Sequence, residues 1–253
     1  MKLFAFIVGI ISLFFVSCSQ SVYDANFNVV ARKKSDSLVK VTHGLDSLLR
    51  LYDRFNMAGN RYGAVVCGEA IGKLYREEAS FDKALEYHKH GLEVSASLND
   101  TLLMSQVLNN LGTCYRRIGS MQAASDYHFK ALNLLENLSD TSYRARKYRL
   151  IALNGIGNIY LTLGNMEVAE KTFRRSMEGE KELGSYLGQA INAANIGATF
   201  ESRKMYDSAY VYYLASLKFN RKAKSNIGLS LCYNHLGQLD ETNGNLAKAL
   251  ENY

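Results

Sequence analysis

Histidine is the residue type in this sequence that most directly offers metal binding or proton exchange near neutral pH. His88 and His90 lie two positions apart, which places them on different sides of a helix. His88 and His128 lie forty positions apart. We expect both to be packed or solvent-edge side chains, with a metal site as the alternative. If the two rings lie close together, protonation of both at about pH 6 is expected to cost stability.

Patterns typical of enzymes are missing from the sequence. It contains no glycine-rich phosphate loop, no nucleophile elbow and no cysteine or histidine pair at zinc spacing. Cys67, Cys114 and Cys232 are far apart and show no disulfide framework, so we expect small buried side chains. The sequence therefore predicts a binding protein with no catalytic residue, no metal and no cofactor.

Asparagine recurs at matching positions of the predicted helices, although it is a poor helix former. The set comprises Asn109, Asn110, Asn154, Asn158, Asn195 and Asn234, which His235 and Gln238 extend. An amide offers both donors and acceptors, which suits contact with an extended peptide backbone. Arg116 and Arg117 offer guanidinium groups for a carboxylate. The alternative is that these amides only hold neighbouring helices together.

An internal repeat positions all of these residues. Its first marker is a glycine that recurs in steps of 40, 45, 40 and 40 residues, at Gly72, Gly112, Gly157, Gly197 and Gly237. Twelve residues later comes an alanine, at Ala84, Ala124, Ala169, Ala209 and Ala249. Four further on comes a ring, at His88, His128, Phe173, Tyr213 and Tyr253. A small residue then follows at Gly91, Ala131, Ser176 and Ser216.

The residue types indicate pairs of closely packed helices. Small residues let two helices approach, and the rings fill the groove between them. One such pair cannot bury its apolar side alone, so neighbouring pairs must stack. The spacing resembles the tetratricopeptide repeat over about residues 60–253. The resemblance implies an all-α fold, a right-handed superhelical solenoid of antiparallel helix pairs, with about 40 residues per repeat instead of the usual 34.

The same resemblance implies where a ligand binds. In this family the first helix of each repeat lines a concave groove, and the asparagine row is similar to the one with which some members grip a peptide. The resemblance assigns peptide or protein binding to Asn109, Asn110, Asn154, Asn158, Asn195, Asn234, Arg116 and Arg117. The expected partner is a protein or peptide in this groove, and no nucleic acid is expected.

Turn signals fall in the same register. Gly119, Gly164 and Gly244 are predicted to end the first helices in a left-handed conformation. Ser120, Asn165 and Asn245 follow and are predicted to cap the second helices. The segments Asn99-Asp100-Thr101 and Ser139-Asp140-Thr141 are predicted to start the helices of the next repeats.

The predicted organisation has four parts. Residues 1–18 are a signal peptide with a lipobox, and 19–27 are a tether. Residues 28–58 are N-terminal capping helices or a degenerate repeat, and 59–253 are about five repeats, the last incomplete. Because a solenoid end needs a polar cap, we expect the chain to continue past Tyr253, or a partner to cover its last helix.

The N-terminus has the features of an export signal. Lys2 precedes an apolar run over residues 3–16, which is shorter than a membrane span. Phe15-Val16-Ser17-Cys18 resembles a bacterial lipobox, which implies lipidation of Cys18. A simply cleaved signal and an uncleaved anchor are the alternatives. The residue after Cys18 is Ser19, whereas an aspartate there would favour the inner membrane. The resemblance therefore implies an outer-membrane lipoprotein on the periplasmic side. Asp36-Ser37-Leu38 resembles the O-glycosylation motif of exported Bacteroidetes proteins.

Composition agrees with a folded helical protein. Apolar residues make up 47% and charged residues 21%, and proline is absent, which favours uninterrupted helices. The formal charge of +6 is spread along the chain, so we attribute it to a solvated surface rather than to nucleic-acid binding. The predicted function is an exported, lipid-anchored scaffold that binds a protein or peptide without catalysis. The alternative is the extracytoplasmic sensor portion of a histidine kinase or transcription regulator.

Overall fold

The computed structural model describes residues 29–252, so the predictions for the signal peptide, the lipobox and the tether lie outside the described residues. Within that range the chain forms helices joined by short turns and contains no strand, which confirms the all-α class. A helix over residues 29–41 comes first. It is followed by α2 (Leu45–Met57), α3 (Arg61–Glu77), α4 (Phe81–Ser97), α5 (Thr101–Ile118), α6 (Met121–Glu136), α7 (Tyr143–Thr162), α8 (Met166–Glu182), α9 (Tyr186–Ser202), α10 (Tyr206–Ala223), α11 (Asn226–Thr242) and α12 (Leu246–Asn252).

The chain forms two compact units, with the division between Val94 and Ser95. In the first unit, α2 packs on α3 around a core of Leu48, Leu51, Phe55, Cys67 and Ile71. The helix over residues 29–41 joins this core through side-chain hydrogen bonds. The Asn60 amide donates to Ser35 Oγ at 2.9 Å, and the Tyr62 hydroxyl donates to Asp36 at 3.0 Å.

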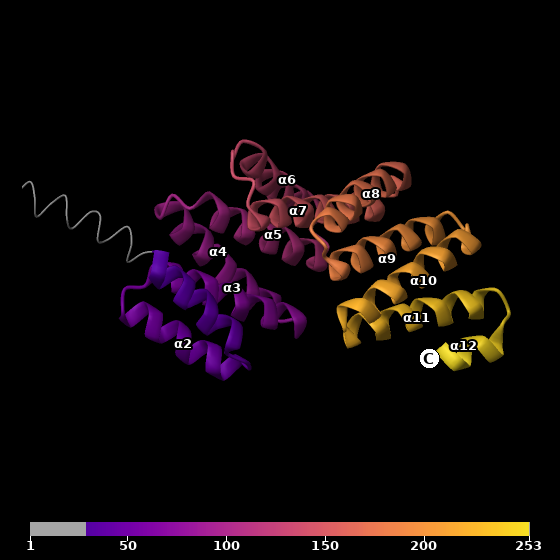
Figure 1. Ribbon diagram of the computed structural model, residues 1–253, viewed down its shortest axis with the longest axis horizontal. Helices are drawn as coiled ribbons and strands as arrows, with labels where there is room; N and C mark the ends of the chain where they lie inside the picture. The colour runs from indigo at the N-terminus through magenta and orange to yellow at the C-terminus, as the bar shows by residue number, and fades with distance from the viewer. Residues whose placement is uncertain (1–28, 253) are drawn as a thin grey trace, which may run out of the picture. The chain divides into compact units, whose positions relative to one another are not determined.

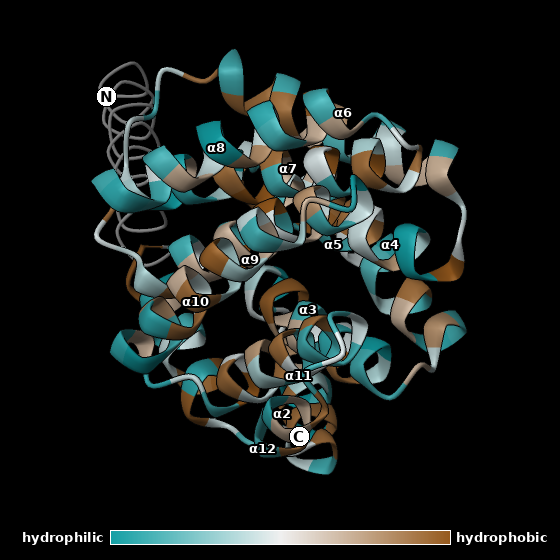
Figure 2. Cartoon of the chain, turned by 90° about the vertical axis from the view of Figure 1, so that its right-hand side faces the viewer, coloured by the Kyte–Doolittle hydropathy of each residue, from teal (hydrophilic) through white to brown (hydrophobic). Residues whose placement is uncertain are grey.

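The second unit is a solenoid of helix pairs. Helices α5 to α12 pack pairwise in chain order, as Figure 1 shows for α7 to α12. Helix α5 also contacts α7, α7 contacts α9, and α9 contacts α11. These four first helices therefore lie side by side, and we call them the first-helix layer. The helices carry apolar and polar sides, seen as brown and teal bands in Figure 2.

Packing explains why the repeat pairs a glycine with a ring. A Cβ added at Gly157 would lie 2.5 Å from the Phe173 ring, and one at Gly197 would lie 2.8 Å from Tyr213. Both rings are completely buried. The ring of the second helix thus lies directly on the backbone of the first, and any side chain at the glycine would push it away. This is the close approach that the spacing predicted.

The turns inside the repeats share one backbone conformation. Gly119, Gly164 and Gly244 have positive φ of 90°, 80° and 77°, as predicted. Ala79 and Lys204 occupy the same register with φ of 58° and 59°, although their residue types gave no such signal.

The predicted helix caps are confirmed in part. Asp100 caps α5 by accepting from the Leu103 amide at 2.9 Å, and Asn165 caps α8 by accepting from Val168 at 3.3 Å. Ser120 makes no capping hydrogen bond, so its prediction was wrong. The Ser120 hydroxyl is therefore not what fixes the start of α6.

The 45-residue step between Gly112 and Gly157 comes from an insertion that lengthens both the turn before α7 and α7 itself, which has 20 residues against 17 in α9. The helix begins after Ser142, whose hydroxyl caps the Ala145 amide at 3.2 Å, so the predicted start at 139–141 was slightly early. The Arg149 guanidinium donates to the carbonyls of Leu135, Leu138 and Asp140 at 2.6, 3.0 and 3.1 Å. One arginine therefore holds the extra residues against the end of α6.

Candidate ligand-binding face

Asn109 lies inside the helix packing of the second unit. Its side chain is 2% exposed. Its amide nitrogen donates to the Tyr148 carbonyl at 3.1 Å, so the amide oxygen faces His128 and accepts from Nδ1 at 3.1 Å. Asn109 thereby joins α5, α6 and α7, and in this structure its polar atoms are used within the repeat.

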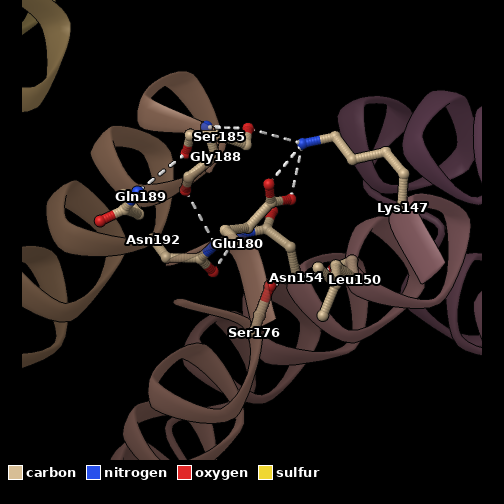
Figure 3. A network of polar contacts seen from close by, with 9 residues as sticks. All are labelled: Lys147, Leu150, Asn154, Ser176, Glu180, Ser185, Gly188, Gln189 and Asn192. Atoms are coloured by element: carbon tan, nitrogen blue, oxygen red, sulfur yellow. Dashed lines mark hydrogen bonds and ion pairs between the residues drawn. The ribbon is translucent and has the colours of Figure 1, made fainter. Parts of the chain in front are cut away.

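Asn154 and Asn158 also make hydrogen bonds within the first-helix layer. The Asn154 amide donates to the Asn192 oxygen at 2.9 Å, which joins α7 to α9 (Figure 3). The Asn158 amide donates to the Asn154 carbonyl at 2.8 Å, one turn earlier in the same helix. Both side chains are partly exposed, so they combine a packing role with access from the surface.

The remaining predicted residues are more accessible, but the structure does not bring all of them together. Asn110, Asn195 and Arg116 are partly exposed, and Asn234 and Arg117 are exposed. Asn195 lines a cavity, whereas Arg116 and Arg117 lie in the last turn of α5. In the extended set, Gln238 is exposed and the His235 ring stacks on Tyr213 with 4.6 Å between centroids.

Exposed apolar side chains on the first-helix layer form a feature that the repeat motif alone does not predict. Five of them are Ile151 on α7, Leu187 and Ile191 on α9, and Ile227 and Leu231 on α11, with exposures of 38, 48, 46, 78 and 56%. Ile151, Ile191 and Leu231 stand at the same position relative to the motif glycine. The repeated sequence therefore shows an apolar residue at this position, but it does not show which apolar positions remain exposed in the fold. We call these five residues the apolar row.

A cavity of about 310 Å³ lies between α9, α10 and α11 and opens at the apolar row. Leu187, Ile191, Ile227 and Leu231 form part of its walls. Its polar lining includes Asn195, Ser216, Asn220, Ser225 and His235. A mostly apolar pocket with a few polar groups is typical of a ligand site.

One repeat earlier, the corresponding space is filled by a polar network around Lys147. The Lys147 ammonium contacts the two carboxylate oxygens of Glu180 at 2.7 and 2.5 Å and donates to Ser185 Oγ at 3.1 Å. Glu180 is only 3% exposed. Figure 3 shows the lysine reaching from α7 towards Glu180 and the first turn of α9. We call this group of residues the Lys147 network.

The buried histidines have different partners. His88 Nδ1 lies 2.9 Å from a Glu69 oxygen, whereas His128 Nδ1 donates to Asn109. Nε2 of both rings is buried and has no hydrogen-bond partner among the described residues. Burial and the nearby Arg116 charge lower the pKa of His128 to about 4. His90 is exposed whereas His88 is buried, so the two lie on different sides of α4, as their spacing predicted.

Within residues 29–252, no group of three histidine, cysteine or acidic side chains is arranged to hold a metal ion. Cys67, Cys114 and Cys232 are buried, as expected, and none forms a disulfide there. Burial raises the pKa of the Cys67 thiol to about 12. These thiols therefore have the character of packing residues.

Stacked helix pairs with an accessible first-helix layer define the class of helical-repeat solenoids. Residues 67–137 and 151–178 each match a family model described as tetratricopeptide repeat. This chain is a tetratricopeptide repeat protein.

Solved structures share this fold at low sequence identity. BtubC from P. vanneervenii is 20% identical, with a TM-score of 0.60 over 87% of each chain. Aspartyl phosphate phosphatase F from Bacillus subtilis is 15% identical, with a TM-score of 0.60 over 79% of this chain and 52% of that one. A Rap protein complexed with competence and sporulation factor is 15% identical, with a TM-score of 0.56 over 86% and 66%. At these identities the likeness shows the fold alone.

A search of curated protein sequences found no match. Among residues 29–252, no helix is both long and apolar enough to cross a membrane.

Proposed function

We propose that this chain is a non-catalytic scaffold that binds a segment of a partner protein across α7, α9 and α11. The observation that carries the proposal is the apolar row. Its five side chains lie on adjacent first helices and keep between 38% and 78% of their surface exposed. Exposed apolar groups that gather on one face are typical of protein-interaction sites.

The arrangement suits an extended polypeptide. Neighbouring packed helices lie roughly 8–10 Å apart, so a strand that crosses them meets successive helices with side chains a few residues apart. The asparagines supply the polar part of this surface. Asn195 stands beside the apolar row and lines the cavity, where its amide is available to pair with a peptide group.

A photo-cross-linking amino acid placed at position 191 of the full chain tests this site in cells. The control is the same amino acid at position 211, because Val211 is an apolar residue on α10 with 63% exposure. We expect a discrete adduct with a protein from position 191 and none from position 211. Equal labelling from both positions, or no adduct at 191, would remove the apolar row as a binding site.

We further propose that the scaffold is exported and held at the periplasmic face of the outer membrane by a lipid on Cys18. The support is the lipobox-like sequence Phe15-Val16-Ser17-Cys18 with Ser19 after it. Labelling of cells with a clickable palmitate analogue tests this. We expect label on the full chain and none on Cys18→Ala. Label retained by the variant, or absent from both, contradicts lipidation at this cysteine.

A further inference from the structure

The cavity and the Lys147 network occupy the same place in consecutive repeats. Moving forward by the 40 residues that separate Gly157 from Gly197, eight of the nine residues drawn in Figure 3 find their counterpart in the cavity lining. The counterparts are Leu187, Ala190, Ala194, Ser216, Asn220, Ser225, Gly228 and Cys232. The network therefore shows, within this chain, what a filled version of the cavity looks like.

Shorter side chains open the cavity. Leu187 stands where Lys147 fills the earlier repeat, and Ala190 stands where Leu150 does. Neither replacement reaches as far as its counterpart, so about 310 Å³ is left open. Leu187 is apolar like the aliphatic part of the Lys147 side chain, but it has no polar group that could hydrogen-bond to a residue at the bottom of the cavity.

Asn220 lies at the bottom of the cavity and is 4% exposed. Its amide nitrogen donates to Ser216 Oγ and Cys232 Sγ, both at 3.3 Å. Its oxygen lies 2.0 Å from the position a Cβ of Gly228 would take, just as a Glu180 oxygen lies 2.0 Å from that of Gly188. Glu180 receives the Lys147 ammonium, whereas no donor among the described residues reaches the Asn220 oxygen. Because Asn220 lines the cavity, a ligand that enters with a hydrogen-bond donor can pair with this amide oxygen.

The cavity lining contains no acidic residue that could pair with a cation. The stretch 208–239 contains no acidic residue, and the acidic Glu180 of the earlier repeat is replaced by the neutral Asn220. The same stretch carries four exposed cations, at Lys218, Arg221, Lys222 and Lys224. The surroundings therefore favour an acidic partner segment whose inserted side chain is itself uncharged.

We propose that this cavity, the Asn220 pocket, takes one anchoring side chain from an acidic segment of the partner protein. The anchor is an uncharged, largely apolar side chain that carries a hydrogen-bond donor, and tyrosine fits this description. Its ring packs among the leucines and isoleucines of the apolar row, and its hydroxyl donates to the Asn220 oxygen. The inference rests on the proposed function and names the chemistry of the partner.

Synthetic acidic peptides that are identical except at one central position test the pocket. The central residue is tyrosine, phenylalanine or lysine, and binding to the full chain is followed by fluorescence anisotropy. We expect the tyrosine peptide to bind about five- to tenfold more tightly than the phenylalanine peptide, because only tyrosine supplies the donor. The lysine peptide should bind more weakly than the tyrosine peptide.

A plug variant, Leu187→Lys with Asn220→Glu, rebuilds the pair that fills the earlier repeat and should fold like the original chain. It should lose at least about tenfold in affinity for the tyrosine peptide, since the anchor would be excluded. A matched control, Val211→Lys with Asn243→Glu, makes the same changes of charge at exposed positions and should bind normally.

Three results overturn the pocket: no binding of the tyrosine peptide, equal binding of the tyrosine and phenylalanine peptides, or undiminished binding by the plug variant. Tighter binding of the lysine peptide overturns the uncharged anchor. A cross-link from position 191 alongside any of these results would retain the scaffold function and reject only the pocket. No cross-link would reject the scaffold function itself.

Discussion

The asparagine residues show how one side-chain type serves different purposes at equivalent positions. The sequence predicted a row of amides along the first helices, and the structure places Asn109 in the packing of three helices. Asn195 lies beside the cavity instead. Residue type and register are visible in the sequence, but burial depends on the neighbours. At Asn109 the deciding neighbours are His128 and Tyr148, which come from two other helices.

Replacement of Asn109 and Asn195 by alanine should separate these roles. Asn109→Ala leaves the buried His128 Nδ1–H without its acceptor, removes the hydrogen bond to the Tyr148 carbonyl, and should cost about 2 kcal/mol of unfolding free energy. Asn195→Ala should change stability by less than about 0.5 kcal/mol. The midpoints of urea unfolding of the two variants measure these changes in stability. Equal losses would show that both amides serve packing.

His128 should make the fold sensitive to acid. Its folded pKa of about 4 lies below the ordinary value, so the unfolded chain binds the proton more tightly. The contribution of neutral His128 is therefore complete above about pH 6.5 and is lost as the pH falls towards 4, at a cost of about 2 kcal/mol between pH 7 and 5. Denaturant titrations at both pH values should show this loss.

The matched control for this titration is His128→Phe, which introduces the residue that Phe173 supplies at the same repeat position. The variant should lose less stability than the original chain between the two pH values. An identical pH dependence would exclude His128 as the source. The alternative for this histidine was a metal site, and residues 29–252 contain no cluster of side chains arranged to hold a metal ion.

At the scale of elements, the repeat spacing identified the helix pairs and most of their boundaries. Glycine and capping residues act locally, so their signals are readable, as at Gly119 and Asp100. The left-handed Lys204 carries no local signal because the helices on either side impose its conformation. The insertion before α7 was visible as a longer step, but its anchoring by Arg149 joins residues that only the fold brings together.

The Lys147 network should be a major source of stability between α7 and α8. Lys147→Ala leaves the Glu180 carboxylate buried without its cation and should cost about 2–3 kcal/mol. The double variant Lys147→Leu with Glu180→Asn introduces the residues found at 187 and 220 and should cost less, because no charge remains buried. Thermal melts of the two variants compare them. A double variant less stable than the single one would contradict this account.

At the scale of the whole chain, the sequence predicted the all-α solenoid because the repeat is periodic and periodicity is readable. The proposed binding surface was less predictable, since the apolar row depends on which apolar residues the stacked helices leave exposed. Ile151 and Ile159 belong to the same helix, yet one is 38% exposed and the other 3%. The export signal belongs to residues outside the described range, and its prediction stands on the sequence alone.

Stability in this molecule should be distributed locally. In the second unit, contacts run between helices that are next or next but one in the chain. A cavity left by Phe173→Ala, at a ring with no exposed surface, should cost about 3–5 kcal/mol in its own repeat and weaken its neighbours. Hydrogen exchange should therefore accelerate most in α7 to α10, while amides of α2 and α3 in the first unit keep their protection. Uniform acceleration along the chain would show that both units unfold together as one cooperative body, and the nearest-neighbour description would then be wrong.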